Sequence, residues 1–376
     1  MTITASSSLC RCVCSETGAK SDLNVPLSRV RIRSFRCLAA VELELHPQRN
    51  YLFGRNGAGK TSVLEAIYML GRGRSFRTRQ NRRLIRHGDA GFSVYGELDS
   101  NEVKHHLGVA LGKEGLRLRL DGKTPTGIAT LAPILPVHVI EPSIHRLIEG
   151  NPRERRRFLD WGVFHVEPRY LDSWRRYRRV LGQRNAALKQ GQGARTWNEG
   201  FLAAAATVNE ARSRYVEKLQ GALAGLGEKL LGSPVEIDYQ SGWRSGLSLP
   251  EALNSSDKND RSFGFTHVGP HRADMVVNMG TRTVRDEVSR GQQKLVAAAL
   301  ILAQIRVSAA DREDGGVLLV DDPAAELDQS ALEGLLAALD ELPAQLVLTG
   351  LSEARLPPAH DFPVFHVEQG RVTPVL

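Results

Sequence analysis

The chain has 376 residues, of which 41% are apolar and 24% are charged, the balance of a soluble globular protein of two or three domains. No apolar stretch reaches the roughly 18 residues of a membrane span, and four cysteines are too few for a disulfide scaffold. We therefore expect a cytoplasmic protein with no membrane partner. The net charge is +8, with 40 arginines against 10 lysines, which favours an acidic partner such as nucleic acid.

The first elements alternate between strand and helix patterns. Residues 1–26 are small and polar and are expected to be a disordered extension. From Leu27, apolar residues at every second position predict two strands around a turn at 34–37, and a third strand is expected over 50–53. Helical spacing of apolar residues over 61–70 completes a strand–loop–helix unit.

The rest of the chain indicates an α/β fold interrupted by an insertion. In order, the patterns predict a small antiparallel sheet over 91–121, helices over 152–231, a strand over 235–239, an exposed loop over 250–260, an apolar helix over 295–305, and strands over 317–320 and 346–349. We expect residues 27–141 and 306–376 to form an ATP-binding lobe with a mixed sheet. Residues 142–305 are expected to form a mainly helical second lobe.

The segment between the third strand and the first helix matches G-x-x-x-x-G-K-[ST] at every position. It consists of Gly54, Arg55, Asn56, Gly57, Ala58, Gly59, Lys60 and Thr61. Glycines at these positions allow backbone N–H groups and the helix N-terminus to bind phosphates. Lys60 is predicted to contact the β- and γ-phosphates of ATP as a catalytic residue, and the Thr61 hydroxyl to bind Mg²⁺.

Two acidic residues follow the apolar strand at 317–320. A carboxylate at the tip of a buried strand beside a phosphate loop can bind the magnesium ion, and we assign this role to Asp321. Asp322, one residue further, is the candidate that positions or deprotonates the attacking water.

A second candidate phosphate-binding segment, Ser289, Arg290, Gly291 and Gln292, precedes the apolar helix at 295–305. Its serine and glycine can present hydroxyl and backbone N–H groups to an anion. The same residues are also typical of a helix cap, and by itself the segment does not separate the two uses.

The order of these motifs, followed by Ala325–Asp328, resembles the Walker A, signature, Walker B and D-loop series of ABC-type ATPase heads, which adds Asp328 to the nucleotide-binding candidates. The distance from Lys60 to Ser289, 289 − 60 = 229 residues, is longer than in a transporter subunit. More specific stretches resemble the RecF family of DNA repair proteins. They are residues 64–78, 155–168, 183–191, 268–275 and 289–304.

The resemblance implies an ATPase that forms an ATP-dependent homodimer, with slow, DNA-stimulated hydrolysis. It also implies binding to double-stranded and gapped DNA at single-strand/double-strand junctions, with RecR and RecO as partners in loading RecA. In that arrangement Ser289, Gly291 and Gln292 of one subunit close over the γ-phosphate held by Lys60 of the other. His138, Pro142-Ser143 and Thr349-Gly350 depart from family or transporter patterns, so γ-phosphate sensing and a switch residue are not assigned.

Two arginine clusters are candidates for contact with DNA phosphates. The first has no acidic residue within it and comprises Arg72, Arg74, Arg77, Arg79, Arg82, Arg83 and Arg86. Phe76, inside this run, can stack on a base or pack in the core. The second cluster, at 153–157 and 175–179, is interspersed with acids that can pair with it, so surface ion pairs are an equal alternative.

Two other functions fit part of the sequence. The energy-coupling subunit of a membrane transporter would share the phosphate loop, but the long insertion and the arginine run disfavour it. A nuclease-linked ATPase would need a separate cluster of metal-binding carboxylates, which the sequence does not display.

Overall fold

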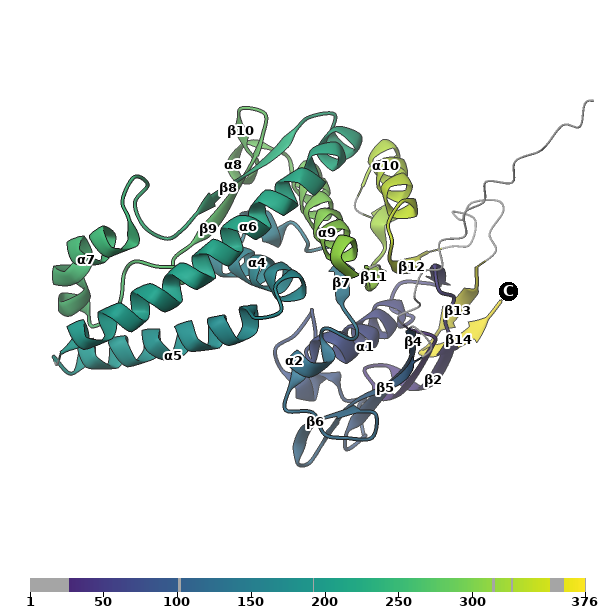
Figure 1. Cartoon of the computed structure of the whole chain (residues 1–376). Helices are drawn as coiled ribbons and strands as arrows, with labels where there is room; N and C mark the ends of the chain where they lie inside the picture. The colour runs from purple at the N-terminus through teal and green to yellow at the C-terminus, as the bar shows by residue number, and fades with distance from the viewer. Residues whose placement is uncertain are drawn as a thin grey trace, which may run out of the picture.

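The computed structural model describes residues 27–100, 103–191, 193–312, 315–325, 327–351 and 362–375. The predicted extension 1–26 lies outside the described residues. Two lobes are visible, one built on two sheets around a central helix and one mainly helical (Figure 1). The α/β class with an inserted helical lobe agrees with the sequence prediction.

The first sheet of lobe I is antiparallel and forms its outer layer. Its order is β2 (Leu38–Glu44), β1 (Arg29–Phe35), β4 (Phe92–Ser100), β5 (Val103–Gly112), β6 (Gly115–Leu120). Val30 pairs with Leu43 and Ile32 with Val41, and all four side chains are buried. The apolar residues at every second position therefore form the buried face of this sheet, and the residues between them form its more exposed face.

The second sheet of lobe I carries the phosphate loop. Its order is β14 (Arg371–Pro374), β13 (Val364–Glu368), β3 (Arg49–Phe53), β12 (Gln345–Gly350), β11 (Val317–Val320), β7 (Val137–Ile140), and every pairing except β13 with β14 is parallel. Helix α1 (Lys60–Arg72) contacts strands of both sheets. Lobe I thus has two separate sheets, and the one that carries the phosphate loop is mixed, as predicted.

Strand β11 belongs to the cores of both lobes. Val317 and Leu319 pack in the core around α1, whereas Leu318 and Val320 pack in the core of the helical lobe. Because side chains alternate across a strand, a fully apolar four-residue strand supplies both faces. The parallel sheet is therefore the wall that the lobes share.

Lobe II is built around the 34-residue helix α6, which packs against α4, α5 and α9. Its helices are α3 (Arg146–Glu149), α4 (Pro152–Val166), α5 (Tyr170–Lys189), α6 (Asn198–Leu231), α7 (Leu249–Phe263), α8 (Val284–Glu287) and α9 (Arg290–Arg312), with a small antiparallel sheet of β10 (Arg282–Thr283), β9 (Asp274–Met279) and β8 (Val235–Gln240). Helices α2 (Ile128–Leu131) and α10 (Gln329–Asp340) complete the fold, with short 3-10 turns at Asn81–Leu84, Ala194–Trp197 and Pro323–Ala325.

One lobe boundary and one element type differ from the prediction. Helix α9 runs without a break through the expected lobe boundary at 305/306. The segment expected to be an exposed loop at 250–260 is helix α7, which begins with a capping box between Ser248 and Glu251. The loop prediction was wrong. The segment is polar in composition, but its few apolar residues, which include Leu249 and Leu253, lie on one buried face of the helix.

Helix α9 is the one described helix whose length and composition would suit a membrane span. The qualifying window, Arg290–Ala310, is 78% buried within the protein. Burial of that kind is typical of the core helix of a globular protein.

Arg72, the last residue of α1, joins the two lobes. Its Cζ atom lies 3.3 Å from the centre of the Trp161 ring on α4 and 5.4 Å from that of Tyr68. Its Nε is buried without a hydrogen-bond partner among the described residues, and burial lowers the pKa of Arg72. Arg72 therefore packs between the lobes and does not belong to an exposed DNA-binding surface, which corrects the prediction.

Candidate nucleotide-binding site

The phosphate loop connects β3 to α1 in a conformation that requires glycine. Gly54, Gly57 and Gly59 have φ angles of 153°, 79° and 119°. A Cβ atom at Gly54 would also lie 2.1 Å from the carbonyl oxygen of Val367. These glycines leave the N-terminus of α1 accessible, where N–H groups and the helix dipole favour an anion.

Lys60 is held within the loop. Its side chain is buried, and Nζ donates hydrogen bonds to the carbonyl oxygens of Gly54 at 2.6 Å and Arg55 at 3.2 Å. Burial lowers the pKa of Lys60, while Asp322 and Asp321 act in the opposite direction. A phosphate anion beside the ammonium would offset the free-energy cost of burying this positive charge.

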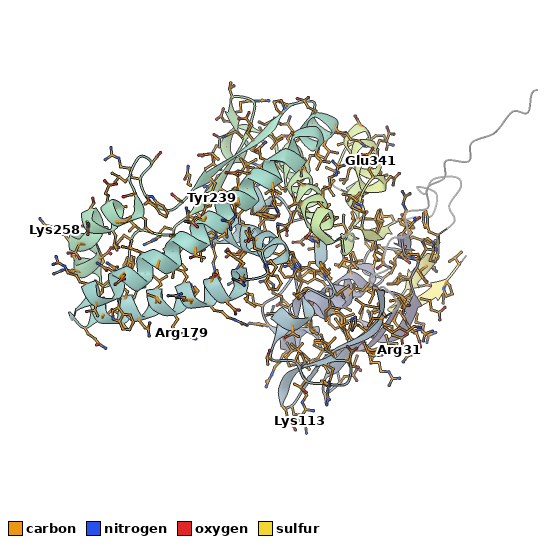
Figure 2. All side chains as sticks on the ribbon, viewed as in Figure 1. Arg31, Lys113, Arg179, Tyr239, Lys258 and Glu341 are labelled. Atoms are coloured by element: carbon orange, nitrogen blue, oxygen red, sulfur yellow. The ribbon has the colours of Figure 1, made fainter. Side chains whose placement is uncertain are left out.

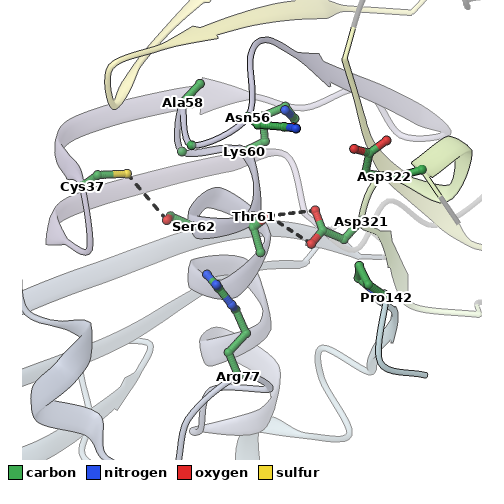
Figure 3. Close-up of a pocket in the computed structure, with 13 residues that line it drawn as sticks. Cys37, Asn56, Ala58, Lys60, Thr61, Ser62, Arg77, Pro142, Asp321 and Asp322 are labelled. Carbon is green, nitrogen blue, oxygen red and sulfur yellow. Dashed lines mark hydrogen bonds between the residues drawn. The ribbon is translucent and has the colours of Figure 1, made fainter. Parts of the chain in front are cut away.

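Thr61 and Asp321 meet across 260 positions of sequence. The Thr61 hydroxyl lies 3.0 Å from both carboxylate oxygens of Asp321 (Figure 3). A hydroxyl and a carboxylate at the base of a phosphate loop are hard oxygen ligands of the kind that Mg²⁺ takes together with nucleotide phosphates. The donor set therefore fits the predicted ion.

Thr349, at the end of β12, orders both acidic residues. Its hydroxyl donates to Asp321 Oδ1 at 3.0 Å and accepts the Asp322 backbone N–H at 3.0 Å. Asp322 has φ 44°, a left-handed conformation that turns the chain sharply after β11. The sequence assigned no role to Thr349, because only the parallel pairing of β11 with β12 brings it beside the acids.

These residues surround a pocket of about 360 Å³, within the range of small-ligand sites. Of the predicted residues, Asn56, Gly57, Ala58, Gly59, Lys60, Thr61, Asp321 and Asp322 line it. Gly54 and Arg55 do not line the pocket, but their carbonyl oxygens accept the hydrogen bonds of Lys60 Nζ. Four further residues line the pocket, of which the sequence analysis assigned no nucleotide contact to Pro142 or Ala325 and did not single out Cys37 or Ser62.

Arg77 also lines this pocket, although the sequence placed it in the DNA-binding run. Figure 3 shows its guanidinium directed towards the turn of α1 that carries Thr61 and Ser62. Its loop is anchored by Ser75, whose hydroxyl donates to the buried Glu65 and accepts the N–H groups of Arg77 and Thr78, each at 2.9 Å. Arg77 is therefore a further candidate for contact with a nucleotide bound in this pocket.

Replacing Arg77 with alanine is therefore expected to weaken ATP binding about tenfold through loss of a charge-assisted contact. Isothermal calorimetry of the variant measures this directly. Arg79→Ala is the matched control, because Arg79 is exposed on the same segment but does not line the pocket. If both variants bind ATP as the wild type does, Arg77 does not contact the nucleotide.

The remaining arginines of the first cluster form an exposed surface beside the pocket. They are Arg74, Arg79, Arg82, Arg83 and Arg86. Phe76 packs against the lobe I core with its ring 5.3 Å from that of Tyr68, so core packing is its role. In the second cluster Arg155 is buried and paired with Asp274 at 2.7 Å, whereas Arg176 and Arg179 are exposed.

The signature segment lies outside the pocket of its own chain. Ser289 and Gln292 cap α9 reciprocally, with Gln292 N–H donating to Ser289 Oγ at 3.3 Å and Ser289 N–H to Gln292 Oε1 at 3.2 Å. Ser289 and Arg290 are exposed, and a Cβ atom at Gly291 would meet no atom closer than 4.0 Å. The segment is both a helix cap and an accessible surface.

Asp328 and His138 take positions that the motifs alone did not specify. Asp328 caps α10 by accepting the N–H of Ala331 at 2.9 Å, and it does not line the pocket. His138 is buried within β7, where burial and then Arg72 lower its pKa to about 3. His138 is therefore a neutral core residue and does not reach the nucleotide pocket; Pro142 of the following loop does.

Residues 26–373 match the family described as RecF/RecN/SMC N terminal domain. The chain is 40% identical over 362 residues to the DNA replication and repair protein RecF of Pseudomonas syringae pv. tomato, covering 92% of this chain and 98% of that protein. It is 36% identical over 358 residues to the protein of the same name from Shewanella pealeana, covering 92% and 99%. The chain belongs to the RecF family.

Solved structures give the same fold for this RecF-family chain. A structure of the recombination mediator RecF with ATP in the RecFOR pathway superposes with a TM-score of 0.82 at 24% identity, covering 93% of this chain and 97% of that one. An Smc head bound to the C-terminal winged-helix domain of ScpA gives a TM-score of 0.58 at 16% identity, covering 93% and 96%. The fold is that of an ABC-type ATPase head, as the order of motifs predicted.

Proposed function

We propose that this protein binds ATP with Mg²⁺ between two subunits and acts in DNA replication and repair as a nucleotide-controlled DNA clamp in the cytoplasm. One observation carries the proposal: the candidate phosphate- and magnesium-binding residues line one pocket of lobe I, while the accessible Ser289–Gln292 segment lies outside that pocket. A second subunit placed head to tail would bring that segment onto the γ-phosphate.

We infer slow, switch-like hydrolysis at this pocket from kinship with RecF proteins. Lys60 and the loop N–H groups would bind the β- and γ-phosphates, and Thr61 with Asp321 would hold Mg²⁺, which would neutralise charge on the phosphates. Asp322 orients or deprotonates water on the γ-phosphate side, and Thr349 fixes the backbone from which its carboxylate projects. Because ATP lies within the interface, its hydrolysis removes contacts between subunits and releases the dimer.

For DNA, the exposed arginines 74, 79, 82, 83 and 86 supply a surface for phosphates. Several phosphate contacts make log K fall by about 0.9 per contact with log salt on duplex DNA. We infer binding at single-strand/double-strand junctions, with RecR and RecO as partners in loading RecA, from kinship with RecF proteins.

The test is the mass in solution of wild type and a Ser289→Arg variant, without nucleotide, with ADP, and with ATP and Mg²⁺. We expect wild type to double in mass only with ATP, and the variant to remain monomeric, since its bulk would occupy the γ-phosphate position. Arg285→Ala, which removes an exposed arginine on the preceding short helix α8, is the control and should still dimerise. If the wild-type mass is the same with and without ATP, although ATP still binds, the two-subunit site is contradicted.

A further inference from the structure

One flank of lobe II is formed by α5 and by segment 264–272, which connects α7 to β9. Thr266 donates its N–H and hydroxyl to Asn185 Oδ1 at 2.9 and 2.7 Å, and Tyr177 hydrogen-bonds His271 Nδ1 at 2.7 Å. The segment therefore runs antiparallel to α5, from its C-terminal end towards its middle. Figure 1 shows α5 along the lower edge of this lobe and α7 at its far end.

Aromatic rings lie along this flank. Phe263 is 65% exposed, and its ring centre lies 5.4 Å from that of His267, which in turn lies 4.2 Å from that of Phe265. Trp174, on α5, is half-buried. A single exposed phenylalanine needs no explanation, but a row of partly exposed rings offers flat apolar surface to a ligand.

Two guanidinium groups lie over rings of this flank. Arg272 Cζ lies 5.5 Å from the centre of the Phe265 ring, and Arg178 Cζ lies 5.5 Å from that of Trp174. Both arginines are exposed. We call the six residues Trp174, Arg178, Phe263, Phe265, His267 and Arg272 the aromatic–basic strip.

The positive charge of the strip is not cancelled by the carboxylate that contacts it. Asp260, which lies 2.9 Å from His267 Nδ1, is fully buried and paired with Arg184 at 2.8 Å. Burial first, and then the charges of Arg272, Arg156 and Arg178, lower the pKa of His271 to about 4. Positive potential from three arginines thus converges on this flank.

We propose that the aromatic–basic strip binds unpaired bases of single-stranded DNA. Rings stack on bases of any sequence, and neighbouring guanidinium groups pair with the phosphates between them. The bases of a duplex are already stacked on one another, so the strip selects the single strand. The inference rests on the proposed DNA-binding function and deepens it, since lobe II would contact the unpaired side of a junction while the arginines near the pocket contact the duplex.

The test compares oligo-dT, duplex DNA and a junction containing 2-aminopurine in the unpaired strand, with the full-length protein and ATP. Phe263→Ala and Arg272→Ala are each expected to weaken oligo-dT binding about 5- to 100-fold and to remove the quenching of 2-aminopurine, with duplex affinity unchanged. Phe263→Trp should retain both. Lys258→Ala is the charge control, because Lys258 is exposed on α7 outside the strip (Figure 2).

The remaining outcomes overturn the inference. Equal loss on oligo-dT and duplex would mean that the strip is a general electrostatic surface. Unchanged oligo-dT binding in both alanine variants would place the single strand elsewhere, and loss of RecR or RecO binding without loss of oligo-dT binding would make the strip a protein interface. Failure of the wild type to bind any DNA with ATP would instead refute the proposed function itself.

Discussion

Replacing Lys60 with methionine is expected to abolish measurable ATP binding and, with it, ATP-driven dimerisation. Lys60 Nζ lies inside the phosphate loop, 2.6 Å from the carbonyl oxygen of Gly54, so the ammonium is positioned before the nucleotide arrives. Each charge-assisted hydrogen bond contributes about 1.5–3 kcal/mol. Two such bonds to phosphate oxygens correspond to an affinity loss of at least about 100-fold.

Calorimetric titration with ATP and Mg²⁺ measures the affinity, and light scattering measures the mass. The fold is expected to survive, because methionine retains the apolar stem and removes a charge that burial disfavours. Lys294→Met is the control, since Lys294 lies on α9 and does not line the pocket. An ATP affinity in Lys60→Met within a factor of two or so of wild type would show that the loop does not bind the nucleotide as proposed.

Local patterns were sufficient for the elements that surround the phosphate loop. The alternation of Val30 and Ile32 predicted β1, and the apolar spacing in 61–70 predicted α1 to within two residues at either end. The glycines predicted the loop itself, because few other residues adopt positive φ angles. The spacing of apolar residues and the residue types of a turn depend on a few neighbouring positions, so they can be recognised in the sequence alone.

Features that depend on distant contacts were not predictable in the same way. Arg77 was grouped with its neighbours by charge, yet it lines the pocket, on a loop that Ser75 anchors through its hydrogen bond to Glu65. Arg72 is directed between the lobes, where its guanidinium stacks on Trp161, 89 positions away. The contacts of Thr349 with the two acidic residues follow from the pairing of β11 with β12, which the sequence does not display. In each case tertiary packing, rather than local composition, assigns the role.

Asp322→Asn is expected to lower the rate of ATP hydrolysis by about 100- to 10,000-fold while leaving ATP binding intact. Asparagine has the same shape and tolerates the left-handed conformation of Asp322, whose φ is 44°. The backbone N–H would still donate to Thr349 Oγ1, so the geometry after β11 is preserved. What is lost is the negative charge that orients or deprotonates the water.

The variant should therefore accumulate as an ATP-bound dimer that persists after excess nucleotide is removed. Phosphate release measures the rate, and size-exclusion chromatography measures the lifetime of the dimer. Asp340→Asn is the control, because Asp340 is an exposed aspartate at the C-terminal end of α10 that does not line the pocket. If Asp322→Asn hydrolyses ATP as fast as wild type, the base lies elsewhere, and Glu141, whose pKa is raised by burial and whose charge interacts with Asp321, becomes the next residue to replace. If hydrolysis stops but the dimer still dissociates at the wild-type rate, hydrolysis is not what opens the clamp.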